Sequence, residues 1–267
     1  MNTESIKEQY QRDGFALGPR VLTDSQIEEL HIELDRVIED RDREAEIRPN
    51  GEKSVLLRNF AADAGKVTWQ IVDIWCASTP FFELAKNPEI TALAAEISDA
   101  NSLKIWHDQI QYKLATTGGT TAWHQDSPAW PVIQPKNEQV TAWIPLDDVD
   151  ESNGCMSMVP GSHRWGVQQE FLSNRDSFDL PESFEGSEIK RVLRPVGRGE
   201  VHFHHPLTWH GSHANESDRP RRAIAVHYAT ERVTYDASGD HPMKPYIKVD
   251  DGESLEGDFF PLVWSVS

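Results

Sequence analysis

The sequence has few cysteines and no long apolar stretch. Its 267 residues include two cysteines, Cys76 and Cys155, which lie far apart and form no CxxC motif. This scarcity argues against a disulfide framework and a cysteine-based zinc site, and it favours a reduced, cytoplasmic setting. The polar N-terminus, MNTESIKEQYQRDG, lacks the apolar core of a signal peptide. No apolar run approaches the roughly 20 residues that span a bilayer, so we expect an intracellular protein with no membrane partner.

Basic residues are scarce relative to acidic ones. There are 26 Lys and Arg residues against 44 Asp and Glu residues, which gives a formal net charge of −18 at pH 7. Nucleic acids and anionic membranes both present negative phosphates, which a surface of this charge repels. We therefore expect no nucleic-acid partner.

Residues 1–100 show the patterns of helices. Thr23–Gln26 has the form of a capping box, and apolar residues then recur at helical spacing from Ile27 to Ile38. Thr79-Pro80 and Asn87-Pro88 both resemble an N-cap followed by proline at the first helical position. We predict a mainly helical region that supports the rest of the chain.

Beyond about residue 100 the pattern changes to short strands separated by Gly, Pro, Asn and Asp. The candidates are Leu103–Leu114, Thr141–Leu146, Cys155–Val159, Val192–Leu193, Glu200–Phe203 and Ala223–Tyr228. Many short strands favour a sandwich, a jelly roll or a barrel. The weakly periodic, acidic stretch at about 166–190 predicts a lid loop. No linker separates the β core, residues 101–267, from the helical part, so we predict a single domain over 1–267.

The strongest local signal is Trp123-His124-Gln125-Asp126. In an extended segment residues i and i+2 point to the same side, so His124 and Asp126 can face one metal ion. Two histidines and one carboxylate leave open positions on the metal, as an Fe(II) oxygenase requires. The tripeptide alone is not specific, because it arises by chance in many proteins.

A third ligand must come from far along the chain. Five histidines lie within residues 201–213, too many to bind one metal ion. Structural or supporting roles suit His202, His204 and His205 better than metal binding. Spacing alone does not decide the third ligand among His204, His205, His210 and His213.

Several motifs occur along the chain, and their order and spacing identify a protein family more specifically than any single motif does. They include His124-x-Asp126, Trp209-His210-Gly211-Ser212 and Arg221, eleven residues after His210. Others are Asp13-Gly14-Phe15, Ser152–Cys155, Val159–His163 and Asn215–Ala223, so that the motifs span nearly the whole chain. Together they resemble the phytanoyl-CoA dioxygenase family of 2-oxoglutarate-dependent oxygenases.

The resemblance implies a fold, a set of cofactors and a metal site. The fold would be mainly β with flanking helices, a double-stranded β-helix of the cupin-like jelly-roll type with the helical N-terminal region packed on it. The enzyme would use Fe(II), with 2-oxoglutarate and O₂ as cosubstrates. By the family pattern, His210 would be the third iron ligand beside His124 and Asp126.

The resemblance further implies a binding site for 2-oxoglutarate. Arg221 would bind the far carboxylate through two parallel hydrogen bonds, and Ser212 would add a hydroxyl. A shift of one residue would give the role of Arg221 to Arg222. Further residues at positions that line the cosubstrate pocket in relatives are Gln111, Lys113 and Trp143.

The implied reaction is hydroxylation of an unactivated C–H bond of a small-molecule metabolite, with release of succinate and CO₂, by a monomer or homodimer. Asp126 argues against halogenation, because relatives that halogenate have a small residue at this position. Trp130, in the loop after Asp126, is a candidate substrate contact. One alternative is a cupin-like metal-dependent isomerase or hydrolase, which would not need Arg221. Another is a binding protein without activity, which a complete set of metal ligands disfavours.

Overall fold

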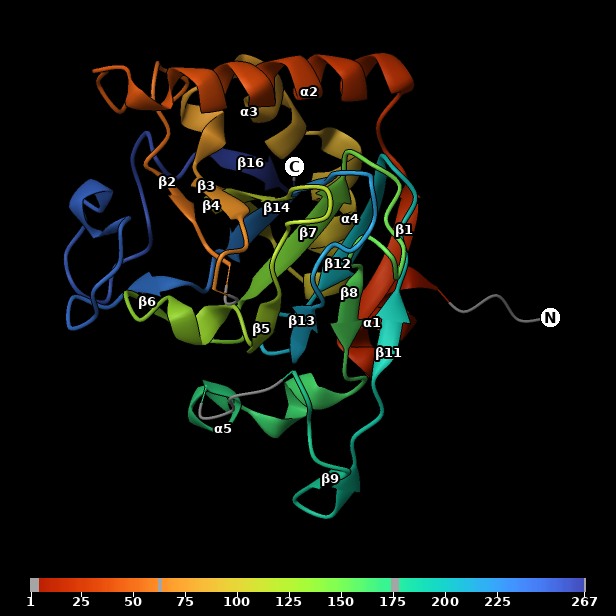
Figure 1. The fold of residues 1–267 in the computed structure, drawn as a ribbon. Coiled ribbons are helices and arrows are strands. Elements are labelled where there is room, and N and C mark those ends of the chain that lie inside the picture. The colour runs from red at the N-terminus through yellow and green to blue at the C-terminus, as the bar shows by residue number, and fades with distance from the viewer. Residues whose placement is uncertain (1–4, 62–63, 174–177, 267) are drawn as a thin grey trace.

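The computed structural model describes residues 5–61, 64–173 and 178–266. In these residues two antiparallel sheets face each other, and helices lie against the outer side of the larger one (Figure 1). Trp143 and Ala225 of the larger sheet pack against Met156 and Met158 of the smaller sheet. This is the arrangement of the predicted jelly roll.

The larger sheet has the strand order β1-β12-β7-β14-β4-β3-β2, and β16 also pairs with β4. The strands are β1 Phe15–Arg20, β2 Leu56–Asn59, β3 Thr68–Val72, β4 Ser102–Lys113, β7 Gln139–Pro145, β12 Glu200–His204, β14 Arg221–Thr230 and β16 Leu262–Ser265. Side chains alternate between the two faces of a strand. In β7, Val140, Ala142 and Ile144 therefore pack with the helices, while Trp143 faces the smaller sheet.

The smaller sheet has the order β11-β8-β13-β5. Its strands are β5 Thr121–His124, β8 Met156–Met158, β11 Val192–Arg194 and β13 His210–Ser212. Two separate two-stranded sheets are β6 Ile133–Gln134 with β15 Thr234–Tyr235, and the hairpin of β9 Ser183–Phe184 with β10 Ser187–Glu188. Because β5 and β13 are neighbours, the two histidine-bearing segments of the sequence lie side by side.

The helices begin where capping residues predict. The α-helices are α1 Ile6–Asp13, α2 Asp24–Glu39, α3 Thr79–Ala85, α4 Pro88–Ser98 and α5 Gln169–Ser173. The Thr23 capping box of α2 and the Asn87 N-cap of α4 are both present, as predicted. For α3 the N-cap is Ser78 rather than Thr79, and Pro80 takes the second position. Proline is tolerated there because the first N–H groups of a helix have no partner in the helix.

Residues 1–100 also complete the larger sheet, which the sequence does not predict. β1, β2 and β3 come from this region and have only six, four and five residues. β1 pairs with β12 and β3 pairs with β4, so partners far along the chain stabilise them. Strands this short carry too few residues for a period of two to be recognised.

The predicted lid at about 166–190 contains more structure than a simple loop. It includes α5 and the β9–β10 pair, while residues 174–177 lie outside the described residues. The rings of Trp165, Phe171 and Phe184 surround Trp209, with centroid distances of 4.9, 5.3 and 5.1 Å. This aromatic cluster anchors the segment beside the residue that precedes His210.

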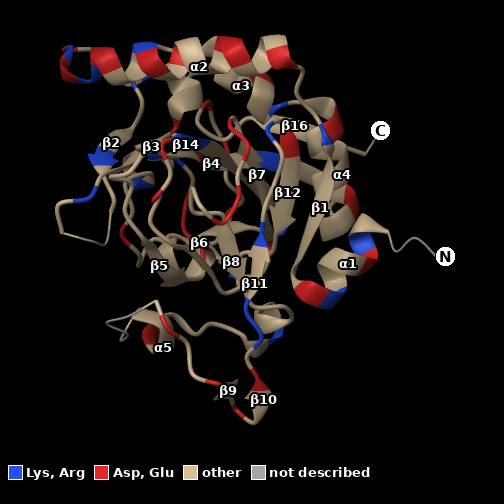
Figure 2. Ribbon diagram, turned by 45° about the vertical axis from the view of Figure 1, so that its right-hand side comes forward, with Lys and Arg blue, Asp and Glu red and all other residues tan. Residues whose placement is uncertain are grey.

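The surface of the outer helix is strongly acidic. α2 carries six Asp and Glu residues and a single Arg, and these acidic positions are visible along the helix in Figure 2. Among the described residues, no helix is long and apolar enough to cross a membrane.

Candidate active site

Three groups that can bind a metal ion meet between the two sheets. His124 ends β5, Asp126 follows it by two residues, and His210 begins β13. His124 and His210 are partners in the register of β5 and β13, and their ring centroids are 4.1 Å apart. One ligand atom of each residue lies within 4.8 Å of the other two. Within residues 5–61, 64–173 and 178–266, no other cluster of His, Cys, Asp and Glu meets this condition.

Asp126 reaches this site from a turn rather than from a strand. The sequence predicts an extended segment, but β5 ends at His124. Asp126 has helical backbone angles, φ −72° and ψ −59°, and precedes the 3-10 helix Ser127–Ala129. Its N–H donates to the Pro206 carbonyl at 2.9 Å, which ties the turn to the loop before His210. The side chains of His124 and Asp126 converge by this route instead of through strand alternation.

The two oxygens of Asp126 have different surroundings. Oδ1 lies 3.7 Å from Nε2 of His124 and 3.5 Å from Nε2 of His210. Oδ2 lies 3.0 Å from Nε2 of His204 and accepts a hydrogen bond from the Thr141 hydroxyl at 3.1 Å. Burial raises the pKa of Asp126, but His210 and the hydrogen bond to His204 outweigh burial and hold it well below its usual value. The carboxylate is therefore ionised, with Oδ1 available to a metal ion.

The hydrogen bonds of His124 and His210 leave one nitrogen of each ring available. Nδ1 of His124 lies 2.8 Å from the Ala122 carbonyl, and Nδ1 of His210 lies 2.9 Å from the Thr208 carbonyl. A carbonyl can only accept, so Nδ1 carries the proton in both rings and Nε2 keeps its lone pair. Burial and the neighbouring His210 lower the pKa of His124 to about 4. The ring is therefore neutral at pH 7, the state in which histidine binds metals.

The other candidates for the third ligand lie outside the cluster of His124, Asp126 and His210. His204 contacts the outer oxygen of Asp126, and its ring centroid is 4.7 Å from that of His210. His205 and His213 pack against other aromatic rings, at centroid distances of 5.1 and 4.0 Å. Of the four candidates, the geometry brings only His210 into the cluster of metal-binding groups.

Among the residues that the structure describes, Arg221 is a buried cation without a carboxylate partner. Its side chain is 1% exposed, and its Nε and Nη1 have no hydrogen-bond partner in this part of the chain. Nη2 donates to the Ser212 hydroxyl at 3.4 Å, and the guanidinium carbon lies 5.8 Å from the centre of the Trp143 ring. Burial lowers the pKa of Arg221 to about 10, so it remains charged at pH 7. A buried charge is costly unless it is paired, which makes this group suited to an anionic ligand.

Arg222, the neighbouring residue, is already paired. Its Nε and Nη2 donate to the two oxygens of Asp147, at 2.9 and 2.7 Å. Successive residues of β14 point to opposite faces, so only Arg221 faces the interior between the sheets. The geometry therefore favours Arg221 over Arg222 as the group that is free to bind the carboxylate of a ligand.

Ser212 connects Arg221 to the metal-binding cluster. It is two residues from His210 in β13, so both side chains lie on one face of the strand. The ammonium group of buried Lys113 donates to the Ser212 hydroxyl at 2.7 Å and to the Ser212 carbonyl at 3.2 Å. Lys113 thus fixes Ser212 instead of lining a cavity itself.

An inner cavity lies between the sheets next to these groups. Its lining includes His124, Asp126 and His210, together with Gln111, Thr121, Trp143, Met156 and Ser212. A 2-oxo acid end could bind a metal ion at the near side, while Arg221 and Ser212 offer donors to a carboxylate at the other. The unpaired N–H groups of Arg221 and the neutral imidazoles fit a metal ion together with a dicarboxylate.

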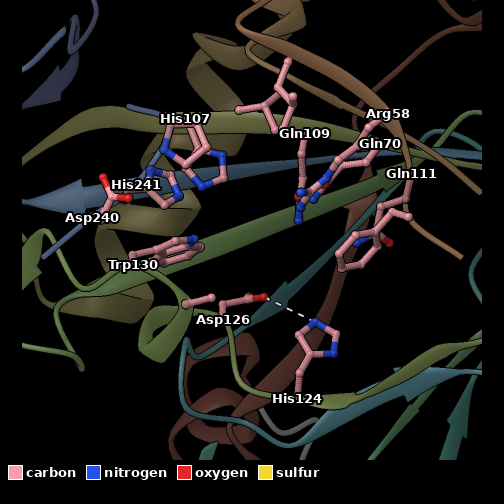
Figure 3. Close-up of a pocket in the computed structure, with 15 residues that line it drawn as sticks. Arg58, Gln70, His107, Gln109, Gln111, His124, Asp126, Trp130, Asp240 and His241 are labelled. Carbon is pink, nitrogen blue, oxygen red and sulfur yellow. Dashed lines mark hydrogen bonds and ion pairs between the residues drawn. The ribbon is translucent and has the colours of Figure 1, made fainter. Parts of the chain in front are cut away.

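A larger outer cavity of about 290 Å³ opens beside His124 and Asp126. Figure 3 shows its two walls, with His107, His241 and Trp130 on one side and Arg58 among glutamines on the other. Gln111 lines both cavities. Trp130, the predicted substrate contact, therefore lines a cavity that His124 and Asp126 also line.

Sequence reasoning missed several residues of the outer cavity. They are Arg58, Gln70, His107, Gln109 and His241. A single histidine or glutamine in an apolar strand gives no pattern, since alternation identifies a face but not what that face lines. In β4, His107 stands beside Asp108, Gln109 and Gln111, so the composition of the strand does not single it out.

Solved structures resemble the chain over almost its whole length. The epimerase SnoN, in complex with Fe³⁺, alpha ketoglutarate and nogalamycin RO, is 27% identical with a TM-score of 0.77 and covers 97% of each chain. The non-haem alpha ketoglutarate-dependent carbocyclase SnoK is 26% identical with a TM-score of 0.77, covering 98% of this chain and 97% of its own. The fold and these likenesses define the class, a non-haem Fe(II)- and 2-oxoglutarate-dependent oxygenase with a cupin-like jelly roll.

The chain belongs to the phytanoyl-CoA dioxygenase (PhyH) family, whose model matches residues 10–223. Peroxisomal phytanoyl-CoA dioxygenase of Bos taurus is 25% identical over 245 residues, which cover 85% of this chain and 68% of that protein. The predictions of family, fold, enzyme class and cofactors are confirmed: Fe(II), 2-oxoglutarate and O₂ are the reagents of this enzyme.

Proposed function

We propose that His124, Asp126 and His210 hold the Fe(II), and that the enzyme hydroxylates an unactivated C–H bond of a small-molecule metabolite with release of succinate and CO₂. The observation that carries the proposal is the buried guanidinium of Arg221, which lies beside Ser212 and has unpaired N–H groups. A metal-dependent isomerase or hydrolase would gain nothing from such a group.

Arg221 and Ser212 would bind the far carboxylate of 2-oxoglutarate. The planar guanidinium can donate two parallel hydrogen bonds, and the hydroxyl adds a third contact. Lys113 keeps Ser212 in position, while Trp143 and Gln111 line the space between this end and the metal ligands. Iron with bound 2-oxoglutarate supplies the oxidising power, and the protein binds, orients and excludes water.

Asp126 supports oxidation of the substrate rather than halogenation. Its carboxylate would take the position on iron that a halide needs. His204 and Thr141 hold Oδ2, so the side chain cannot easily turn away from the metal. Trp130 would then contact the substrate in the outer cavity.

An anaerobic titration with Fe(II) and 2-oxoglutarate tests the function. Binding of both should produce a visible absorption band from charge transfer between the metal and the cosubstrate. The next step is to measure succinate release over candidate metabolites. Normal metal binding without this band would contradict the proposal.

Hydroxylation as the outcome of the reaction needs a test of its own, because the two similar structures are those of an epimerase and a carbocyclase. Hydroxylation transfers one atom of O₂ to the product and the other to succinate. With ¹⁸O₂, mass spectrometry should therefore find one labelled oxygen in the product. Unlabelled product alongside labelled succinate would instead indicate epimerisation, ring closure or desaturation.

We further propose that the enzyme works in the cytoplasm as a monomer or homodimer. The two cysteines are both buried and do not pair with each other, which suits a reduced setting. Light scattering and cell fractionation would test these two expectations.

A further inference from the structure

Two histidines in the outer cavity present complementary hydrogen-bonding groups. His107 comes from β4 and His241 from the C-terminal segment, and their ring centroids are 5.7 Å apart. Both line the cavity, and Figure 3 shows them together above Trp130. Neither is one of the proposed metal ligands.

His107 presents a hydrogen-bond acceptor. Its Nδ1 lies 3.2 Å from the Asp108 carbonyl, so Nδ1 carries the proton and Nε2 keeps a lone pair. The side chain is 3% exposed, and no group of the described residues bonds to Nε2. Burial, aided by His227 and His241, lowers the pKa of His107 well below its usual value. The ring is therefore neutral, and its buried acceptor needs a donor from a ligand.

His241 presents a donor to the same space. Its Nδ1 accepts the backbone N–H of Met243 at 3.2 Å. Nδ1 therefore carries no proton in the neutral ring, and Nε2 bears the N–H. Burial lowers the pKa of His241 to about 4, so the ring is neutral at pH 7.

The rest of the cavity favours a compact ring. Trp130 lies edge-on to His107 at 5.3 Å and offers a flat apolar surface. On the opposite wall Arg58 donates to Gln70 at 2.8 Å, and Gln70 donates to Gln109 at 2.6 Å. Arg58 and Asp240, which are exposed and of opposite charge, also line the cavity. The volume of about 290 Å³ is at the small end of ligand pockets, which span roughly 300–1,000 Å³.

We propose that the outer cavity recognises a substrate hydroxyl on a compact ring, which donates to Nε2 of His107 and accepts from Nε2 of His241 while the ring packs on Trp130. A carboxylate could not donate to His107, and an ammonium could not accept from His241. A site built around a hydroxyl rejects analogues that lack it, because its own polar groups are then left unpaired. The inference rests on the proposed function only in treating this cavity as the substrate site.

The test compares two probes of the same shape, 4-fluorophenol and 4-fluorotoluene, by ¹⁹F NMR. The protein is loaded with 2-oxoglutarate and with Zn(II) in place of iron, so no turnover is needed. The wild type should bind the phenol about tenfold more tightly than the toluene, as one buried hydrogen bond predicts. His107→Phe should reduce this ratio to about one. His31→Phe, the same change at a histidine remote from the cavity, should leave the ratio unchanged.

Equal binding of the two probes by the wild type, or no binding of the phenol, would overturn the proposal. An unchanged ratio in His107→Phe would do so as well. Should His107→Phe fail to fold, His241→Phe at its partly exposed position serves instead, with an expected loss of at least about threefold in the ratio. Because the ratio does not depend on the visible band of the Fe(II) complex, failure of this inference is distinguishable from failure of the proposed function.

Discussion

At the residue scale, Arg221 and Arg222 show how position decides what one residue type can do. The two are adjacent in β14, yet Arg222 forms a bidentate pair with Asp147 and Arg221 has no carboxylate partner. Their roles should therefore separate cleanly on mutation.

Arg221→Ala should weaken binding of 2-oxoglutarate by at least about thirtyfold, because loss of one partner of a buried charged contact costs about 2 kcal/mol or more. Anaerobic titration of the visible band measures this affinity. Arg222→Ala is the matched control: it should change the affinity less than about threefold and lower the melting temperature instead, since Asp147 loses its partner. Equal effects of the two substitutions on the affinity would argue against the assigned role of Arg221.

His204 should act on the metal through Asp126. It lies 3.0 Å from Oδ2, whereas His124 and His210 approach Oδ1. His204→Phe removes this contact and should lower Fe(II) affinity by about 10- to 100-fold, as is typical when the group that orients a ligand is lost. Competition with a chromophoric chelator measures the affinity, with His31→Phe as control. An affinity like that of the wild type would show that Asp126 needs no such support.

At the element scale, the contact between β5 and β13 holds the two histidines together. Gly211 lies between His210 and Ser212, and a Cβ there would meet Phe178 at 2.8 Å and the Thr121 carbonyl at 2.9 Å. Both contacts are closer than packed atoms tolerate, and the carbonyl belongs to the backbone of β5. A side chain at this position would force the strands apart.

Gly211→Ala should therefore cost about 1–3 kcal/mol in stability and also weaken Fe(II) binding. Chemical denaturation and the chelator assay measure the two effects separately. Gly186→Ala, in the turn between β9 and β10, is the control: nothing lies within 4 Å of its Cβ, but its φ is +80°. It should lose stability through backbone strain alone, with unchanged metal affinity. Loss of metal affinity in the control, or none in Gly211→Ala, would refute this explanation.

Elements with strong local signals could be predicted from the sequence. The capping residues located α2 and α4, and the long strands β4 and β14 follow from their composition. β1 and β3 could not be predicted, because they form against β12 and β4, which are far away in the chain.

Only the part of the site that local motifs and the order of the family's motifs indicate could be predicted from the sequence. The His124 motif identified two groups of the candidate metal site, although Asp126 lies in a turn and not in a strand. Selecting His210 from the sequence needed the family order, because its nearness to His124 depends on the register of β5 with β13. His107 and His241 gave no signal, because their hydrogen-bonding states follow from tertiary contacts.

At the scale of the whole molecule, a buried pair of carboxyl groups joins the helical layer to the larger sheet. Asp73 and Asp108 are both 0% exposed. Oδ1 of Asp73 accepts from the Trp75 indole at 3.0 Å and the Asp108 N–H at 3.2 Å, while Oδ1 of Asp108 accepts from the Ile74 N–H at 2.8 Å. Oδ2 of each accepts no hydrogen bond from any residue that the structure describes. Burial raises the pKa of both, that of Asp73 to about 8, and repulsion by Asp73 adds to the rise at Asp108.

This pair should make the protein less stable as pH rises from about 4 to about 8. In the unfolded chain a carboxyl ionises near pH 4, whereas the folded protein keeps the proton on Asp73 up to about pH 8. The folded state binds more protons in this window, so the stability is fully present below pH 4 and is lost as pH rises through the folded pKa. Carboxylates with a lowered pKa, such as Asp126, make the protein more stable as pH rises. The contribution of the Asp73–Asp108 pair is therefore measured by comparing variants.

Asp73→Asn should reduce this dependence; part of it remains, because burial still raises the pKa of Asp108 in the variant. Asparagine tolerates the left-handed backbone of this position, where φ is +53°, and it keeps an oxygen that can accept from Trp75. Relative to this variant, the wild type should lose at least about 1 kcal/mol of unfolding free energy between pH 4.5 and pH 8, measured by urea denaturation at several pH values. Asp258→Asn, at an exposed carboxylate, should reproduce the wild-type profile. Parallel profiles for the wild type and Asp73→Asn would mean that Asp73 ionises alike in the folded and unfolded chains.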